Sequence, residues 1–196
     1  MQSHKASLTH FTNDELFRLL AYMRQHDKQL HAMALLALWH GMRRGEVLEL
    51  TPQNFRDGRI TFNRLKGSNP CSAQKLSKHP VPEYDEVAAV QRFIDYPQIR
   101  DDGRVMLFDL NERQINRLMV RYCDAVGIPR HKAHWSSFKH TTCKLLLPIL
   151  GVTELQMHVG HVEVKNTLAY TRASAEEVQT KLDAAIAEHR AMIAGD

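Results

Sequence analysis

Residues 159–170 read VGHVEVKNTLAY, which places Tyr170 nine residues after the pair Gly160-His161. Far upstream, residues 41–46 read GMRRGE and put Arg43 two residues after a glycine. A tyrosine hydroxyl has a free pKa of about 10, so it needs nearby cations and a proton acceptor before it becomes a good nucleophile. Arginine, histidine and tyrosine in this order form a set of groups suited to attack on a phosphodiester. Because separate segments supply them, the combination is more specific than any one piece.

The overall composition is that of a single globular unit. The chain has 196 residues, of which 43% are hydrophobic and 24% charged, so we expect one domain over residues 1–196 with a buried core. No apolar run approaches the ~20 residues of a membrane span, and residues 1–5 lack the apolar stretch of a signal peptide. A net charge of +4 and a pI near 9.0 permit nucleic-acid binding without establishing it.

Cysteine and histidine usage predicts neither a disulfide nor a metal site. The three cysteines show no paired spacing, which favours reduced thiols in a cytoplasmic protein. Two histidine pairs, His131-x-x-His134 and His158-x-x-His161, have metal-like spacing. Neither pair has a cysteine or carboxylate partner at a ligand-like distance along the chain, so we expect no metal and no cofactor.

The first third of the chain predicts helices with clear ends. Thr12-x-x-Glu15 is a capping box, and four apolar residues follow it at helical spacing; they are Leu16, Leu19, Leu20 and Met23. A second helix runs through residues 30–38 and is expected to end at Gly41. A short helix over residues 45–50 cannot continue far because Pro52 follows.

A small antiparallel sheet is expected next. Asp57-Gly58 is typical of a hairpin turn, and residues 59–63 alternate as a strand does. Turn residues at 66–70 and prolines at 80 and 82 bound a returning strand, so three strands are expected within about residues 53–82. Helices then resume, which predicts a mainly α fold with a small antiparallel β-sheet (α+β); their expected ranges are 85–93, 112–126, 136–147, 152–158, 164–170 and 174–193.

Placed on this organisation, the chain resembles the catalytic domain of the tyrosine recombinase (phage integrase) family over nearly its whole length. Residues 41–46 look like the first arginine box of that family, with Arg43 at the catalytic position. Lys66, in the turn of the small sheet, looks like the catalytic hairpin lysine. The segment 159–161 followed by Tyr170 looks like the last box and the nucleophile.

The second arginine box departs from the family pattern. The family has a histidine, two residues, an arginine, and then histidine and threonine, whereas residues 136–141 here read SSFKHT. Ser136 therefore stands at the histidine position and Lys139 at the arginine position. His134 is close enough in sequence for a shifted alignment, which the sequence does not settle.

The resemblance implies a site-specific DNA recombinase of phage, plasmid or integrated-element origin that acts on double-stranded DNA through a 3′-phosphotyrosyl intermediate, without metal or nucleotide. Arg43 would hold the phosphate oxygens, Lys66 would protonate the leaving 5′ oxygen, and His161 would bind the phosphate or take the proton of Tyr170. Lys139 and Ser136 predict a weakened enzyme. The resemblance also implies a tetramer on DNA, with the final helix docking onto a neighbouring protomer. Most members have an N-terminal DNA-clamping domain, which is not expected here.

Two other interpretations remain open at this point. One is a recombinase-like protein whose altered second box leaves only DNA binding. The other is a helix-turn-helix regulator built on the two short helices expected within residues 151–171.

Overall fold

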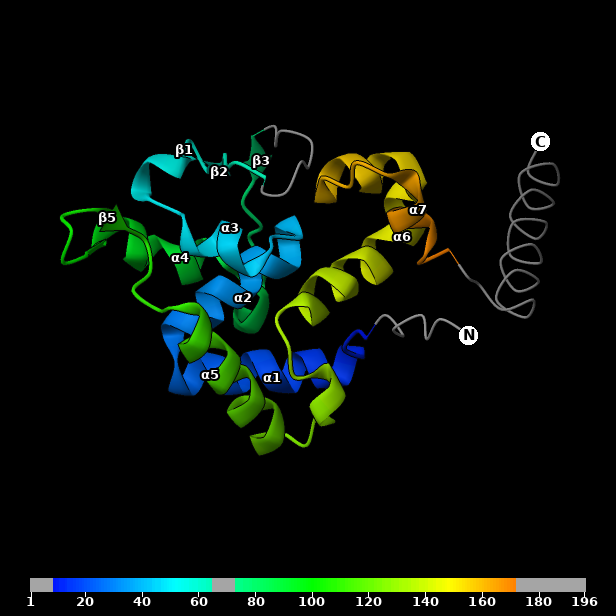
Figure 1. Ribbon diagram of the computed structural model, residues 1–196, viewed down its shortest axis with the longest axis horizontal. Helices are drawn as coiled ribbons and strands as arrows, with labels where there is room; N and C mark the ends of the chain where they lie inside the picture. The colour runs from blue at the N-terminus through cyan, green and yellow to red at the C-terminus, as the bar shows by residue number, and fades with distance from the viewer. Residues whose placement is uncertain (1–8, 65–72, 172–196) are drawn as a thin grey trace, which may run out of the picture.

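Helix α2 (Lys28–His40) lies at the centre of the fold in the computed structural model, which describes residues 9–64 and 73–171. Helices α1 (Asn13–His26), α4 (Glu86–Asp95) and α6 (Ser136–Val159) all pack against it, as Figure 1 shows. Nearly every residue of α2 is buried. A helix that is apolar all round can be stable in water only when other elements cover it in this way.

Local capping sets the first two helices as predicted. Thr12 Oγ1 accepts the Glu15 backbone N–H at 3.2 Å, and Glu15 Oε2 accepts the Thr12 backbone N–H at 2.8 Å. The four apolar residues after this capping box are all buried. Helix α2 ends at Gly41, whose φ of 59° is the left-handed conformation that glycine adopts without strain.

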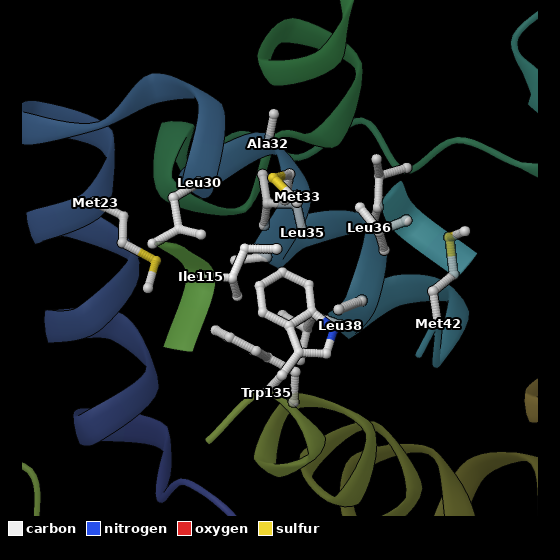
Figure 2. Close-up of a cluster of buried hydrophobic side chains, with 14 of the residues drawn as sticks. Met23, Leu30, Ala32, Met33, Leu35, Leu36, Leu38, Met42, Ile115 and Trp135 are labelled. Carbon is white, nitrogen blue, oxygen red and sulfur yellow. The ribbon is translucent and has the colours of Figure 1, made fainter. Parts of the chain in front are cut away.

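The core is built on α2 from several directions. Figure 2 shows Ile115, from α5 (Glu112–Ala125), and Trp135, just before α6, directed toward Leu38 of α2. All three side chains are buried. The start of α6 is therefore fixed against the central helix by a large aromatic side chain.

Two small antiparallel sheets accompany the helices. Strands β1 (Phe55–Arg56), β2 (Arg59–Ile60) and β3 (Gln74–Lys75) form a sheet in that order, and Asp57-Gly58 turns between the first two with positive φ at both residues. The strand expected over 59–63 is shorter, since only its first two residues pair. A second sheet, of β4 (Gln98–Ile99) and β5 (Val105–Met106), was not predicted.

Helix α6 carries the chain from the body of the molecule to α7 (Val164–Leu168), which packs against its far end (Figure 1). Gly151 interrupts the helix with φ 73° and ψ −179°, at the break expected between residues 147 and 152. Gly160 then ends it in the left-handed conformation. The final helix expected over 174–193 lies outside the described residues.

The remaining elements are α3 (Arg44–Leu48) and the 3-10 turns Pro52–Asn54, Pro82–Tyr84 and Arg130–Lys132. The fold class is mainly α with small antiparallel sheets, as predicted. Within the described ranges, no helix is both long and apolar enough to cross a bilayer.

Candidate active site

A pocket of about 500 Å³ opens between the α2–α3 corner and the start of α6. Three of the sequence-predicted site residues line it, namely Arg43, Ser136 and Lys139. Its remaining lining residues come from the same corner, from α5, from the segment before α6 and from α6 itself; they are Met42, Arg44, Gly45, Glu112, Asn116, His134, Trp135 and His140. The fold thus brings the first and second boxes, almost 100 residues apart, to one surface.

Arg43 is held in place by Glu46, one turn away. Glu46 Oε2 accepts the Arg43 backbone N–H at 2.7 Å, and Oε1 accepts from Nη1 at 3.0 Å. The carboxylate is fully buried, whereas 32% of the Arg43 side chain is exposed. A buried anion therefore fixes one edge of the guanidinium, and Arg43 also lines the pocket.

Arg64 also holds Glu46 in place, and the sequence analysis did not identify Arg64 as a site residue. Its side chain is only 1% exposed, and Nη1 lies 3.3 Å from Glu46 Oε2. The same guanidinium donates to the carbonyls of Gly41 at 3.1 Å, His40 at 2.8 Å and His158 at 2.7 Å. It joins the end of α2, the anion behind Arg43 and the end of α6. A lone arginine after a strand carries no sequence pattern that would reveal this.

Two glycines allow these segments to meet. A Cβ added at Gly41 would lie 2.8 Å from Cγ1 of Val159, and one added at Gly160 would lie 2.8 Å from Nε of Arg64. Both contacts are shorter than side chains tolerate, and both glycines have positive φ. The glycines of the first and last boxes thus serve close packing of one helix end against the other.

Lys139 is largely buried at the base of the pocket. The residue is 8% exposed, and Nζ donates to the Val159 carbonyl at 2.8 Å. Burial, together with the positive charges of Arg43 and Arg64, lowers the pKa of Lys139 to about 7. An arginine would keep its charge here, whereas this lysine titrates near neutral pH.

Ser136 and His134 occupy the pocket together. Nδ1 of His134 lies 2.9 Å from Oγ of Ser136, and its Nε2 lies 2.7 Å from Oγ1 of Thr9. Ser136 is the exposed first residue of α6, and Lys139 follows one turn later. The serine therefore has an imidazole within hydrogen-bond distance, although the histidine expected by the family pattern is absent from position 136.

His161 lies among the same cations. Burial, with Lys139, Arg43 and Arg64 nearby, lowers its pKa to about 4, so the ring is neutral at pH 7. Nδ1 is paired with Thr167 Oγ1 at 3.0 Å, and Nε2 makes no hydrogen bond to another described residue. This orientation leaves one ring nitrogen for a ligand.

Tyr170 contacts the pocket through His140, which the sequence analysis did not name as a site residue. Its hydroxyl is hydrogen-bonded to Nδ1 of His140, a residue that lines the pocket. The ring packs on a small cluster formed by Cys143, Leu155 and Val159. Burial and the neighbouring Cys143 raise the pKa of Tyr170. The phenol is thus protonated at neutral pH and needs a base.

Two further expectations from the sequence concern Lys66 and a metal ion. Lys66 lies outside the described residues. Among residues 9–64 and 73–171, no three His, Cys, Asp or Glu side chains are grouped so that they would hold a metal ion.

Comparison with known proteins places this geometry in context. The model of the phage integrase family matches residues 9–177, whereas a search of curated proteins found no match. The fold is similar to that of XerA recombinase (20% identity, TM-score 0.69), over 88% of this chain and 63% of that one. It is also similar to the catalytic domain of bacteriophage HP1 integrase (17% identity, TM-score 0.60; 90% and 94% covered).

A third similar structure is the Tn1549 transposon integrase (residues 82–397) in complex with circular intermediate DNA. It is 17% identical with a TM-score of 0.67, and the match covers 93% of this chain and 69% of that one. At these identities the likeness concerns the fold. The chain spans less than two thirds of the XerA recombinase.

Proposed function

Because the chain belongs to the phage integrase family, we propose that it is a site-specific DNA recombinase that cuts and rejoins double-stranded DNA through a 3′-phosphotyrosyl bond to Tyr170. The observation that carries the proposal is the pocket in which Arg43, Ser136 and Lys139 converge, with the Tyr170 hydroxyl joined to its wall by His140. Relatives of the same fold have been solved with DNA, among them XerH recombinase bound to its difH substrate.

The pocket is suited to a phosphate. Arg43 lines it with a guanidinium, a cation whose planar geometry suits phosphate oxygens. One of the three N–H donors of the Lys139 ammonium binds the Val159 carbonyl, and the other two can donate to the ligand. Ser136 adds a hydroxyl at the exposed start of α6. These donors stabilise the charge that develops when the phosphate becomes five-coordinate.

The reaction then follows from the groups present. Tyr170 Oη bonds to phosphorus as the bond to the 5′ oxygen breaks, and Lys66 gives a proton to that oxygen. His161 donates from its unpaired ring nitrogen to the phosphate. The phosphotyrosyl bond retains the energy of the broken phosphodiester, so a second 5′ hydroxyl reverses the step and joins a new strand. We expect several protomers, in a tetramer, to do this together on DNA in the cytoplasm of a bacterial cell.

A specific observation favours a second candidate, a protein that binds DNA without cutting it. Lys139 stands where the family has arginine, it is buried, and its ammonium is already bonded to a carbonyl. The family match extends through residues 151–171, so it favours both of these functions over a helix-turn-helix regulator.

Covalent trapping separates the two candidates. Duplexes that bind the chain are first selected from a randomised pool. Each is then nicked near its centre, so that cleavage releases a short fragment with the 5′ hydroxyl, which diffuses away and cannot be rejoined. We expect a denaturant-stable adduct that forms in chelator and is absent with Tyr170→Phe, while the affinity of that variant for DNA is unchanged. Binding that weakens steeply with salt is expected in both cases. Selected duplexes that bind but never form an adduct would support the binding protein instead.

A further inference from the structure

Nδ1 of His140 lies within hydrogen-bond distance of the Tyr170 hydroxyl, and the Cys143 thiol also interacts with that hydroxyl. The two ring centroids are 5.9 Å apart and the planes are inclined by 38°, so the contact joins Nδ1 and Oη edge to edge. His140 lies on α6 directly after Lys139, and its side chain also lines the pocket. One imidazole therefore touches both the nucleophile and the cavity proposed for the phosphate.

The electrostatic surroundings set the direction of this hydrogen bond. Burial lowers the pKa of His140 to about 4, and the positive charge that His134, Lys139 and His10 can carry acts in the same direction. A neutral imidazole has one lone pair to accept a proton. Burial beside Cys143 raises the pKa of Tyr170, so its hydroxyl keeps its proton and donates. In the tautomer that carries its proton on Nε2, the phenol donates to Nδ1 of His140.

His161, the histidine of the last box, is placed differently. Its Nδ1 is engaged by Thr167 at 3.0 Å, and its ring lies under the influence of three cations. No hydrogen bond links it to Tyr170 among the described residues. The pKa of each imidazole is lowered to about 4, so geometry and not basicity separates them: His140 contacts the Tyr170 hydroxyl, whereas Nδ1 of His161 is engaged by Thr167.

From this division we propose that His140 is the general base that takes the proton of Tyr170. As Oη bonds to phosphorus, the O–H electron pair stays on Oη and the proton moves to Nδ1 of His140. In the reverse step the imidazolium returns that proton to the departing phenolate. The negative phosphate next to His140 favours its protonated form in the complex. This inference rests on the proposed function, because it needs Tyr170 to be the nucleophile.

A structural role for His140 makes a different prediction. If the hydrogen bond only holds the phenol away from the pocket, its removal frees the nucleophile and adduct formation accelerates. If it only supports the fold, its removal slows the reaction by the same factor whatever the acidity of the phenol. A base, in contrast, matters less as the phenol becomes more acidic.

The experiment uses the nicked duplex and the full chain, with the single-turnover rate of adduct formation as readout. His140→Gln keeps an acceptor atom of similar size but cannot take the proton, and His131→Gln removes an exposed histidine outside the pocket as a matched control. We expect His140→Gln to slow adduct formation by ~10²-fold or more and to slow religation equally, with DNA affinity retained. We expect His131→Gln to match the wild type.

The decisive arm places 2,3,5-trifluorotyrosine at position 170, which lowers the pKa of the phenol. We expect the deficit of His140→Gln to shrink to within about tenfold in this background. A deficit that stays the same, or a rate for His140→Gln equal to or above wild type, would overturn the proposal while leaving the Tyr170 adduct intact. A wild-type chain that forms no Tyr170 adduct would overturn the proposed function and the assignment of His140 with it.

Discussion

The carbonyl of Val159 accepts a hydrogen bond of 2.8 Å from Nζ of Lys139, twenty residues earlier in the chain. This contact links the start of α6 to its end across the break at Gly151. It connects the altered second box to the last box, since Gly160 and His161 follow directly. A cation of the proposed phosphate site is thus also a structural tie.

The first prediction concerns the charge of Lys139. Lys139→Ala should slow adduct formation by ~10²-fold or more, because one charge-assisted contact to the transition state is lost. Lys139→Arg should keep or raise the rate, since a planar fork replaces a single ammonium. Both rates are measured on the nicked duplex. Indifference of the rate to Lys139→Ala would show that this residue does not contact the phosphate.

The second prediction is a pH dependence of DNA affinity. The pKa of Lys139 is lowered to about 7, so the ammonium loses its charge as pH rises above that value. In the Tyr170→Phe background, affinity should weaken between pH 7 and 9 more than it does with Lys139→Arg, whose guanidinium stays charged. In the chain without DNA, His140 and His161 have pKa values of about 4 and are neutral over this range.

Folding stability should show the opposite trend from the same residue. In the unfolded chain Lys139 keeps its proton up to about pH 10.4, whereas in the folded chain it loses the proton near pH 7. The unfolded state then binds more protons between these values, so the contribution of Lys139 to the free energy of unfolding rises with pH. Denaturant unfolding at pH 7 and 9 should show this rise in the wild type and not in Lys139→Arg. Equal slopes would contradict the lowered pKa.

The third prediction addresses the support beneath Arg43. Arg64→Gln removes the buried cation that contacts Glu46 and three carbonyls, and should lower the free energy of unfolding by about 3 kcal/mol. Arg56→Gln is the control, because the Arg56 side chain is 91% exposed and its ion pair within the described ranges is with the exposed Asp57; its effect should stay within about 0.5 kcal/mol. Similar effects of the two changes on denaturant unfolding would refute the structural role of Arg64.

The fourth prediction compares two glycines that both have a positive φ, Gly41 and Gly58. Gly58→Ala places a Cβ in open space at φ +68°, so it should cost ~1–2 kcal/mol for the left-handed conformation alone. Gly41→Ala has the same strain and also drives its Cβ against Val159, which should add ~1–3 kcal/mol. Thermal or denaturant unfolding of the two variants measures the difference. If the two costs are equal, the α2 and α6 ends are not packed as closely as described.

Short-range features were predictable from the sequence because their chemistry is local. The Thr12 capping box, the glycine stop at Gly41 and the hairpin turn at residues 57–58 all depend on residues within a few positions of one another. The helical character of the fold follows from apolar spacing alone. The two-residue pairing of β4 with β5 was missed, since so short a strand leaves no alternating pattern to detect.

The sequence by itself determined the order of four site residues along the chain, and this order predicted the family. They are Arg43, Lys139, His161 and Tyr170. The tertiary structure alone decided what surrounds these residues. Arg64 meets the His158 carbonyl 94 positions away, and Tyr170 meets His140 across 30. Such contacts depend on how α2, α6 and α7 pack, and no local spacing encodes that packing. The lowered pKa of Lys139 has the same origin, because burial and neighbouring charge are properties of the folded chain.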